Sequence, residues 1–277
     1  GIDYMELGYI NSRSQFPPGE FGPWKHCGEE DLRRVVGDND TQLKLSAMAD
    51  AEKSDYKTEI LPKSESVLDV IRVATYIHQI PLALDMIKDA HDKGYETTVN
   101  LMAVSTVQER ELDEGVELLA QSEAQVIYVV DSFGSMYSEQ VEALTEKYLR
   151  FAAPAGKEVG IHCHNNRQLA FGNTIQGIIK GANFVDGSFA GLGRGAGNAP
   201  MELLLSFLHN PKYRLRPVLK CIEDTIEPLR KDVMWGYDYP YMITGILNEH
   251  PRSGMAFNAA KDRGSMVQFY DEMASKE

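Results

Sequence analysis

Two histidines separated by one residue give the clearest chemical signal in the sequence. His162 and His164 lie in the run GIHCHNN, residues 160–166, which is apolar before the pair and polar after it. Side chains two residues apart in a strand point to the same side, so the imidazoles would project together and Cys163 the other way. Such a pair predicts a divalent cation, Mn²⁺, Mg²⁺, Fe²⁺, Co²⁺ or Zn²⁺, with an acid among the further ligands. The alternative is two ordinary core or surface histidines.

A glycine-rich stretch is the second candidate. The run AGLGRGAGNAP, residues 190–200, precedes the helix-like run MELLLSFL. Its repeated glycines allow unusual backbone angles and close approach to a ligand. Asn198 could cap the following helix, or could be a further metal ligand or an orienter of substrate. The stretch lacks the GxxxxGK[ST] pattern and is therefore not interpreted as a phosphate-binding P-loop.

The run VVDSFGSMY, residues 129–137, also follows a predicted strand. Asp131 and Ser132 would face the same rim, and both are candidate substrate-binding residues. Ser132 and the backbone around Gly134 could bind a carboxylate. Asp131 could equally be a helix-capping or loop residue.

Strands and helices must alternate to position these residues. Short runs of strand-like composition are predicted as strands at 2–9, 42–50, 68–76, 96–104, 125–134, 158–166 and 183–191. Helical patterns lie at 81–94, 107–123, 137–152 and 167–182, the third with Ser138 as its expected N-cap. This alternation predicts a parallel sheet, whose carboxyl ends carry the active site in αβ folds.

The length of the repeating region favours a (β/α)₈ barrel over a doubly wound open sheet. The strand pattern is one short of eight and starts at the second residue, so we expect the first βα unit to be absent from this chain. Residues 1–205 are expected to form strands 2–8 of the barrel as a catalytic domain. Residues 206–277 are expected to form a helical extension packed on it.

Composition excludes several classes of protein. The 277 residues carry a net charge of −13, which argues against nucleic acid or an anionic membrane as partner. Three cysteines without a CxxC pair give no disulfide framework. The sequence has neither a long apolar run nor a signal peptide, and a cytoplasmic location is expected.

The three motifs resemble the DRE-TIM metallolyases, a superfamily of metal-dependent lyases, aldolases and acyltransferases with an HMG-CoA lyase-like barrel. The likeness lies in GIHCHNNRQLAFGNTI, VDGSFAGLGRGAGNAPMELLL and VVDSFGSMY, and covers most of residues 1–205. Within the superfamily, GLGRGAGNAPMELLL and YMITGILNEHPRSGMAF are most similar to the 4-hydroxy-2-oxovalerate aldolase branch.

This resemblance implies a (β/α)₈ barrel with Mn²⁺ or Mg²⁺ that cleaves a 4-hydroxy-2-oxo acid to pyruvate and an aldehyde through a metal-stabilised enolate. His162 and His164 match the family's metal histidines, and Asn198 matches an asparagine at or beside the metal. Tyr241 is the candidate for a catalytic tyrosine, and Ser132 for a carboxylate anchor. The family's Arg-Asp-Gly motif, at the end of the first strand, is not in this sequence. The chain is therefore expected to be a fragment, or else an altered member.

Three alternatives stay open. A Claisen-type acyltransferase similar to isopropylmalate or homocitrate synthase would carry a larger C-terminal region, and a coenzyme A lyase would carry a cysteine-containing loop near the last strands. A barrel without the Arg-Asp motif could also be a non-catalytic binding subunit. Relatives can form homodimers or bind an aldehyde dehydrogenase, and either partner is possible here beside the small 2-oxo acid substrate.

Overall fold

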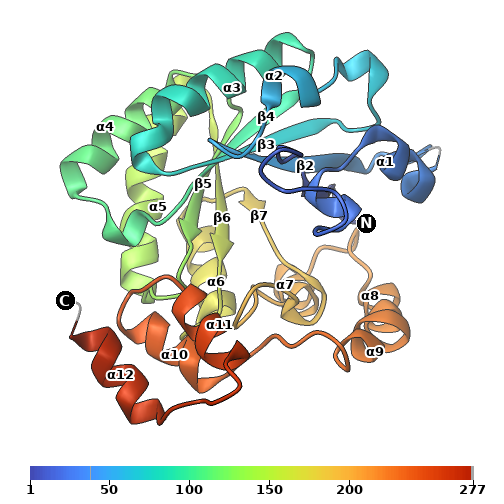
Figure 1. Ribbon diagram of the computed structural model, residues 1–277. Helices are drawn as coiled ribbons and strands as arrows, with labels where there is room; N and C mark the ends of the chain where they lie inside the picture. The colour runs from blue at the N-terminus through green and yellow to red at the C-terminus, as the bar shows by residue number, and fades with distance from the viewer. Residues whose placement is uncertain (38, 276–277) are drawn as a thin grey trace. The chain divides into compact units, whose positions relative to one another are not determined.

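The computed structural model describes residues 1–37 and 39–275. Its strands lie side by side in chain order, and the pairs β1–β2, β2–β3, β3–β4 and β6–β7 are parallel (Figure 1). The predicted succession of βα units, as in a (β/α)₈ barrel, is confirmed. The strands are β1 (Tyr4–Tyr9), β2 (Lys44–Asp50), β3 (Val70–Thr75), β4 (Glu96–Leu101), β5 (Val126–Asp131), β6 (Glu158–Cys163) and β7 (Phe184–Val185).

Helices follow the strands and fill the C-terminal part of the chain. The α-helices are α1 (Glu29–Val36), α2 (Tyr56–Glu59), α3 (Ile80–Asp92), α4 (Glu109–Ala120), α5 (Ser138–Ala152), α6 (Ala170–Lys180), α7 (Met201–Leu208), α8 (Leu215–Cys221), α9 (Glu227–Leu229), α10 (Tyr239–Ile246), α11 (Arg252–Ala259) and α12 (Met266–Ala274). Short 3₁₀ segments lie at Pro23–Lys25, Lys63–Glu65, Ile77–Gln79, Val104–Thr106, Ala153–Ala155 and Phe189–Gly191, and a π-helical turn at Ile222–Ile226.

One predicted cap is wrong. Ser138 is the first residue of α5 and not the residue before it. Its hydroxyl donates a hydrogen bond to Oδ1 of Asn173 in α6, at 3.1 Å. The carbonyl of Tyr137 accepts from the amide of Val141 at 3.2 Å, so the cap position falls on Tyr137.

Contacts divide the described chain into two compact units. The N-terminal unit consists of Gly1–Met102, Gln108–Tyr128 and Tyr148–Val159. The C-terminal unit consists of Ala103–Val107, Val129–Lys147 and Gly160–Glu277.

In the N-terminal unit, helix α3 covers the sheet with one apolar stripe. Its buried residues Ala83, Met86, Ile87 and Ala90 recur at helical spacing and pack against β3 and β4. Every residue of β3 is buried. Among them is Arg72, whose guanidinium lies 3.1 Å from the carboxylate of Glu6 and 4.5 Å from the ring centroid of Tyr128.

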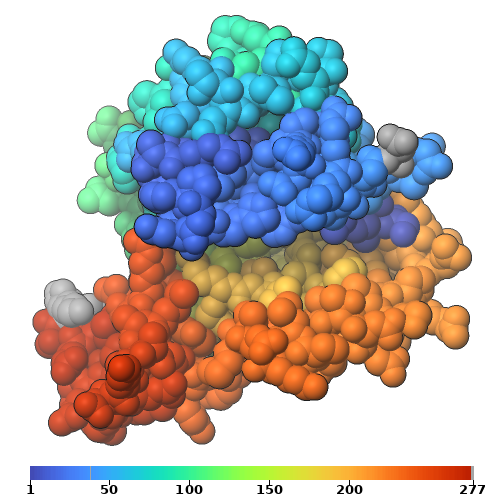
Figure 2. Space-filling model, turned by 45° about the vertical axis from the view of Figure 1, so that its right-hand side comes forward, coloured from blue at the N-terminus to red at the C-terminus, as the bar shows by residue number. Residues whose placement is uncertain are grey.

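In the C-terminal unit, α6 packs closely on β6. A Cβ built on Gly177 of α6 would lie 2.7 Å from the Cδ1 atom of Ile161. Helices α10 and α12 share a small apolar core of Ile243, Phe269 and Met273, and Phe257 of α11 packs against it. Parts of α8–α12, orange to red, reach the surface seen in Figure 2. Within residues 1–37 and 39–275, no helix has the length and apolar character needed to cross a membrane.

Candidate metal site

The two histidines lie at the carboxyl end of β6. Their ring centroids are 5.1 Å apart, with an angle of 78° between the planes. Cys163 between them is only 1% exposed, as expected for a side chain that points to the covered side of the sheet. The strand geometry therefore brings both imidazoles together.

Asp186 fixes the orientation of the first imidazole. Its Oδ2 lies 2.9 Å from Nδ1 of His162, and its own amide donates to the carbonyl of Ile161 at 3.1 Å. A carboxylate only accepts, so Nδ1 carries a proton, and Nε2 is the ring nitrogen left for a cation. Sequence reasoning expected an acid among the site residues but did not identify Asp186. Its position, one residue after β7, was the available signal.

His164 is paired with the glycine-rich stretch. It forms an isolated antiparallel bridge with Asn198, and its amide donates to the carbonyl of Asp131 at 3.2 Å. Burial, followed by the neighbouring His162 and Arg194, holds the pKa of His164 well below its usual range. The ring is therefore neutral at physiological pH, which is the form that ligates metals.

Asn198 presents an unsatisfied oxygen. Its Nδ2 donates to the carbonyl of Leu192 at 3.1 Å, while Oδ1 is buried and has no hydrogen-bond partner in the described residues. Helix α7 begins later and has Pro200 at its N-cap position, so the alternative that Asn198 caps this helix is wrong. A buried, unsatisfied amide oxygen on the residue bridged to His164 fits a divalent cation that takes nitrogen and oxygen ligands.

Glycine is required around this asparagine. A Cβ on Gly193 would lie 2.5 Å from Nδ2 of Asn198, and one on Gly197 would lie 2.2 Å from the carbonyl oxygen of Gly191. Gly197 also has a φ of +86°, a conformation that L-residues rarely adopt. The glycine-rich stretch therefore holds Asn198 in place through contacts that larger residues would prevent.

The side chain of Asp131 is used within its own turn, whereas that of Ser132 binds another segment. The carboxylate of Asp131 accepts from the amides of Ser135 and Met136 at 3.0 and 3.3 Å, and burial raises its pKa to about 6. This geometry supports the loop role that the sequence left open for Asp131. Ser132 Oγ accepts from the amide of Ala103 at 2.8 Å, which leaves its hydroxyl proton available to another acceptor.

The rim also carries Arg194, which sequence reasoning did not select, and the predicted Tyr241. Arg194 donates to the carbonyl of Ser132 at 2.9 Å, and it lies near enough to His164 to lower its pKa. Tyr241 in α10 packs on the same stretch, because a Cβ on Gly195 would lie 3.4 Å from its ring. The signal for Arg194 was its place as the only basic residue of the glycine-rich stretch.

Two imidazoles and an amide are the candidate donors that the chain brings together. Over residues 1–37 and 39–275, no three side chains from His, Cys, Asp and Glu converge closely enough to hold a cation by themselves. The candidate site thus depends on Asn198 beside His162 and His164.

These strands and strand-end residues place the chain in the class of (β/α)₈-barrel proteins. The model of the HMGL-like family matches residues 46–225, which is more than half of the chain. The chain belongs to the HMGL-like family.

Individual relatives agree with this assignment. The chain is 34% identical over 165 residues to a 4-hydroxy-2-oxovalerate aldolase of Pelotomaculum thermopropionicum, a match that covers 58% of this chain and 48% of the relative. It is 32% identical over 205 residues to the enzyme of that name from Thermus thermophilus, covering 73% and 58%. The chain therefore spans about half the length of the curated relatives it matches.

Solved structures show the same fold. The N-terminal domain of a protein from Bacteroides vulgatus superposes with a TM-score of 0.78 at 27% identity, covering 96% of this chain and 88% of that one. The HMG-CoA lyase of Bacillus subtilis superposes with a TM-score of 0.66 at 18% identity, covering 83% and 82%. The second likeness concerns the fold alone.

Proposed function

We propose that the protein acts as a divalent-metal-dependent aldolase that cleaves a 4-hydroxy-2-oxo acid to pyruvate and an aldehyde. The observation that carries the proposal is the buried, unsatisfied Oδ1 of Asn198, a residue whose backbone is bridged to His164, together with the neighbouring imidazoles of His162 and His164. The names of the relatives in Pelotomaculum and Thermus support the reaction type. We assign the activity to residues 1–205, with residues 206–277 supplying Tyr241.

Mn²⁺ or Mg²⁺ would be held by Nε2 of His162, the ring of His164 and Oδ1 of Asn198. When bound, such a cation supplies Lewis acidity that polarises the 2-oxo group for cleavage of the adjacent carbon–carbon bond. Asp186 keeps the Nδ1 proton on His162 and so keeps its Nε2 lone pair directed outward.

Substrate groups would be held by the surrounding rim. Arg194 is the cation suited to the substrate carboxylate, and Ser132 can add a hydroxyl donor. Tyr241 is our candidate for a hydroxyl that exchanges a proton with the departing aldehyde oxygen. Its place against Gly195 supports this role, because the ring packs on the stretch that carries Asn198.

The first test is Mn²⁺ binding, followed by EPR titration of the whole chain. We expect one bound ion, with His162→Ala or Asn198→Ala weakening binding at least tenfold. His91→Ala is the matched control, because His91 is exposed on α3 and its Nδ1 lies 3.7 Å from the carboxylate of neighbouring Asp92. No binding by the unaltered chain, or equal binding by His162→Ala, would disprove the metal site.

The second test is product formation with the metal-loaded chain. Pyruvate release from 4-hydroxy-2-oxopentanoate, followed with lactate dehydrogenase and NADH, is the expected activity. Release of free thiol from acetyl-CoA with a 2-oxo acid would instead identify an acyltransferase. Normal Mn²⁺ binding with neither product would overturn the catalytic proposal while leaving the metal site intact.

A further inference from the structure

Three consecutive residues after β6 connect the candidate metal site with helix α10, all within the C-terminal unit. The amide of Asn165 donates to the carbonyl of Gly197 in the glycine-rich stretch, at 2.9 Å. The side chains of Asn166 and Arg167 bind α10, the helix that carries Tyr241. The loop that follows the two histidines therefore contacts both the stretch that holds the proposed amide ligand and the helix of the proposed proton-exchanging hydroxyl.

Asn166 holds the backbone of Tyr241. The residue is 1% exposed, and its Nδ2 donates to the carbonyl of Tyr241 at 3.1 Å and to Oγ1 of Thr244 at 3.3 Å. The hydroxyl of Thr244, a fully buried residue, donates to the same carbonyl at 2.9 Å. Asn166 lies so close to α10 that a Cβ on Gly245 would be 2.8 Å from the Cβ of Asn166. Two buried donors therefore fix the backbone from which the tyrosine ring extends.

Arg167 binds the carboxyl end of the same helix. Its Nε and Nη2 donate to the carbonyls of Gly245 and Ile246, the last residues of α10, at 3.0 and 2.8 Å. The last carbonyls of a helix have no partner within it and carry partial negative charge, which a guanidinium matches. The guanidinium also lies 4.4 Å from the centroid of the Tyr137 ring. Helix α10 is thus held near its first turn by Asn166 and at its last residues by Arg167.

Two glycines give the ring of Tyr241 its place. A Cβ on Gly195 would lie 3.4 Å from both Cδ1 and Cε1 of the ring, and one on Gly254 would lie 3.0 Å from Cδ1. The ring therefore packs between α11 and the glycine-rich stretch that carries Asn198. Its backbone is held by Asn166 and its ring by these contacts, so its hydroxyl has a defined position.

We propose that Asn166 is a positioning residue, which sets the place of the Tyr241 hydroxyl relative to the cation held at Asn198. The inference rests on the proposed aldolase function, in which this hydroxyl exchanges a proton with the departing aldehyde oxygen. Asn166 acts through the backbone of Tyr241 and not through the substrate. Proton transfer requires donor and acceptor within hydrogen-bond reach, and a displacement of about 1 Å can lower a rate by about 100-fold.

The first measurement is pyruvate release from 4-hydroxy-2-oxopentanoate by the Mn²⁺-loaded chain. Asn166→Ala should lower kcat by about tenfold or more, while KM and the Mn²⁺ dissociation constant change by less than about threefold. Thr244→Val keeps the shape but removes one donor to the same carbonyl, and it should lower kcat by a smaller factor. In a Tyr241→Phe background, Asn166→Ala should lower kcat no further, because the hydroxyl that it positions is absent.

Asn173→Ala is the matched control. Asn173 is also fully buried in the C-terminal unit, and its Nδ2 donates at 2.8 Å to the carbonyl of Met136, outside α10. The variant loses a similar buried hydrogen bond, so its thermal stability should fall about as much as that of Asn166→Ala. Its kcat should stay near that of the unaltered chain. An equal fall of kcat in Asn173→Ala and Asn166→Ala would overturn the inference.

The second measurement follows Tyr241 without any activity. The chain has 13 tyrosines, and labelling the metal-free protein with 3-fluorotyrosine makes them visible by ¹⁹F NMR, with Tyr241→Phe identifying the resonance of interest. Asn166→Ala should shift or broaden that resonance, and Asn173→Ala should not. An unchanged resonance would overturn the inference, as would an equal loss of kcat with and without the Tyr241 hydroxyl. If the unaltered chain releases no pyruvate, the proposed function fails instead, and the resonance alone decides whether Asn166 positions Tyr241.

Discussion

Replacing Asp186 should weaken cation binding without removing a proposed ligand. The residue is held on both sides, because its amide donates to Ile161 and its carboxylate accepts from His162. The carboxylate keeps the imidazole in one tautomer and one orientation. Asp186→Asn retains an acceptor but loses the charge, whereas Asp186→Ala loses both.

The size of the effect follows from the geometry and exposure of this bond. Its length is 2.9 Å, and the side chains of His162 and Asp186 are 21% and 18% exposed. Hydrogen bonds to charged groups contribute about 1.5–3 kcal/mol, and partial exposure places this bond near the lower end. The Ala variant should therefore bind Mn²⁺ about tenfold more weakly, since about 1.4 kcal/mol corresponds to a factor of ten. The Asn variant should lie between it and the unaltered chain.

The assay is Mn²⁺ titration by EPR at neutral pH, with thermal unfolding of the metal-free variants to verify the fold. Asp262→Ala is the control, because Asp262 is exposed and remote in sequence from β6 and β7. If Asp186→Ala binds Mn²⁺ as tightly as the unaltered chain while folding normally, the carboxylate does not orient a metal ligand. The argument for His162 Nε2 would then fail.

Three further predictions concern stability and reactivity. Gly172 and Gly177 lie on the same helix, α6. A Cβ added at Gly172 would have no neighbour within 4 Å, whereas a Cβ added at Gly177 would lie 2.7 Å from the side chain of buried Ile161. Gly172→Ala should stabilise the fold by up to ~1 kcal/mol in urea unfolding. The Gly177→Ala variant should be less stable than the Gly172→Ala variant by ~1–3 kcal/mol. Equal free energies of unfolding for the two variants would refute the packing of α6 on β6. Tyr148→Phe should raise the free energy of unfolding by about 1 kcal/mol, because the hydroxyl is fully buried without a partner in the described residues; a clear loss of stability would mean that the hydroxyl is satisfied in solution. Burial raises the pKa of Cys27 to about 12, so its reactive thiolate forms only well above pH 8. Iodoacetamide at pH 8 should therefore label half-buried Cys221 first, as read by peptide mass spectrometry, and early labelling of Cys27 would contradict its burial.

The βα succession was predictable because each strand is a short run of apolar or β-branched residues. Strand β3, VIRVAT, is buried along its whole length, and its many β-branched residues are typical of a buried strand. Strand β7 is much shorter than the predicted 183–191, since only Phe184 and Val185 pair with β6. Helices α1 and α2 escaped prediction. Helix α1 is short and rich in charge, and α2 is a single turn.

The site was only partly predictable, for a physical reason. The spacing of His162 and His164 fixes their common side, so strand geometry alone brings them together. The role of Asn198 depends on where its Nδ2 finds a partner, and that partner, Leu192, is set by the path of the glycine-rich stretch. Similarly, several acids follow strands in this sequence, and only the fold shows that Asp186 is the one beside His162.

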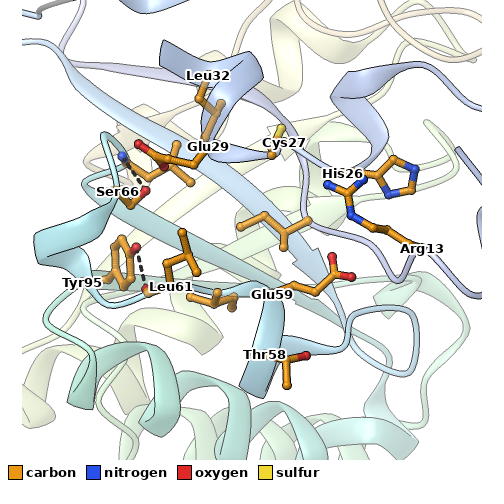
Figure 3. Close-up of a pocket in the computed structure, with 14 residues that line it drawn as sticks. Arg13, His26, Cys27, Glu29, Leu32, Thr58, Glu59, Leu61, Ser66 and Tyr95 are labelled. Carbon is orange, nitrogen blue, oxygen red and sulfur yellow. Dashed lines mark hydrogen bonds between the residues drawn. The ribbon is translucent and has the colours of Figure 1, made fainter. Parts of the chain in front are cut away.

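A cavity in the N-terminal unit, lined by His26 and Tyr95 among other residues (Figure 3), had no sequence signal. Its lining comes from the ends of β1, from α1 and from the segments before β3 and β4, which lie far apart along the chain. A site built from neighbouring residues, such as His162 and His164, can therefore be predicted from the sequence. A site assembled from residues far apart along the chain becomes visible only in the fold.

The glycine-rich stretch around Asn198 has an entropic consequence. Glycines lose more backbone freedom on folding than other residues, and a loop ordered only by its ligand would subtract that cost from affinity. Here the stretch is already ordered by hydrogen bonds from Asn165 to Gly197, from Asn198 to Gly191, from Gly236 to Gly195 and from Trp235 to Ala190. The loss of freedom therefore occurs during folding of the chain, and Oδ1 of Asn198 meets a cation as a preorganised donor.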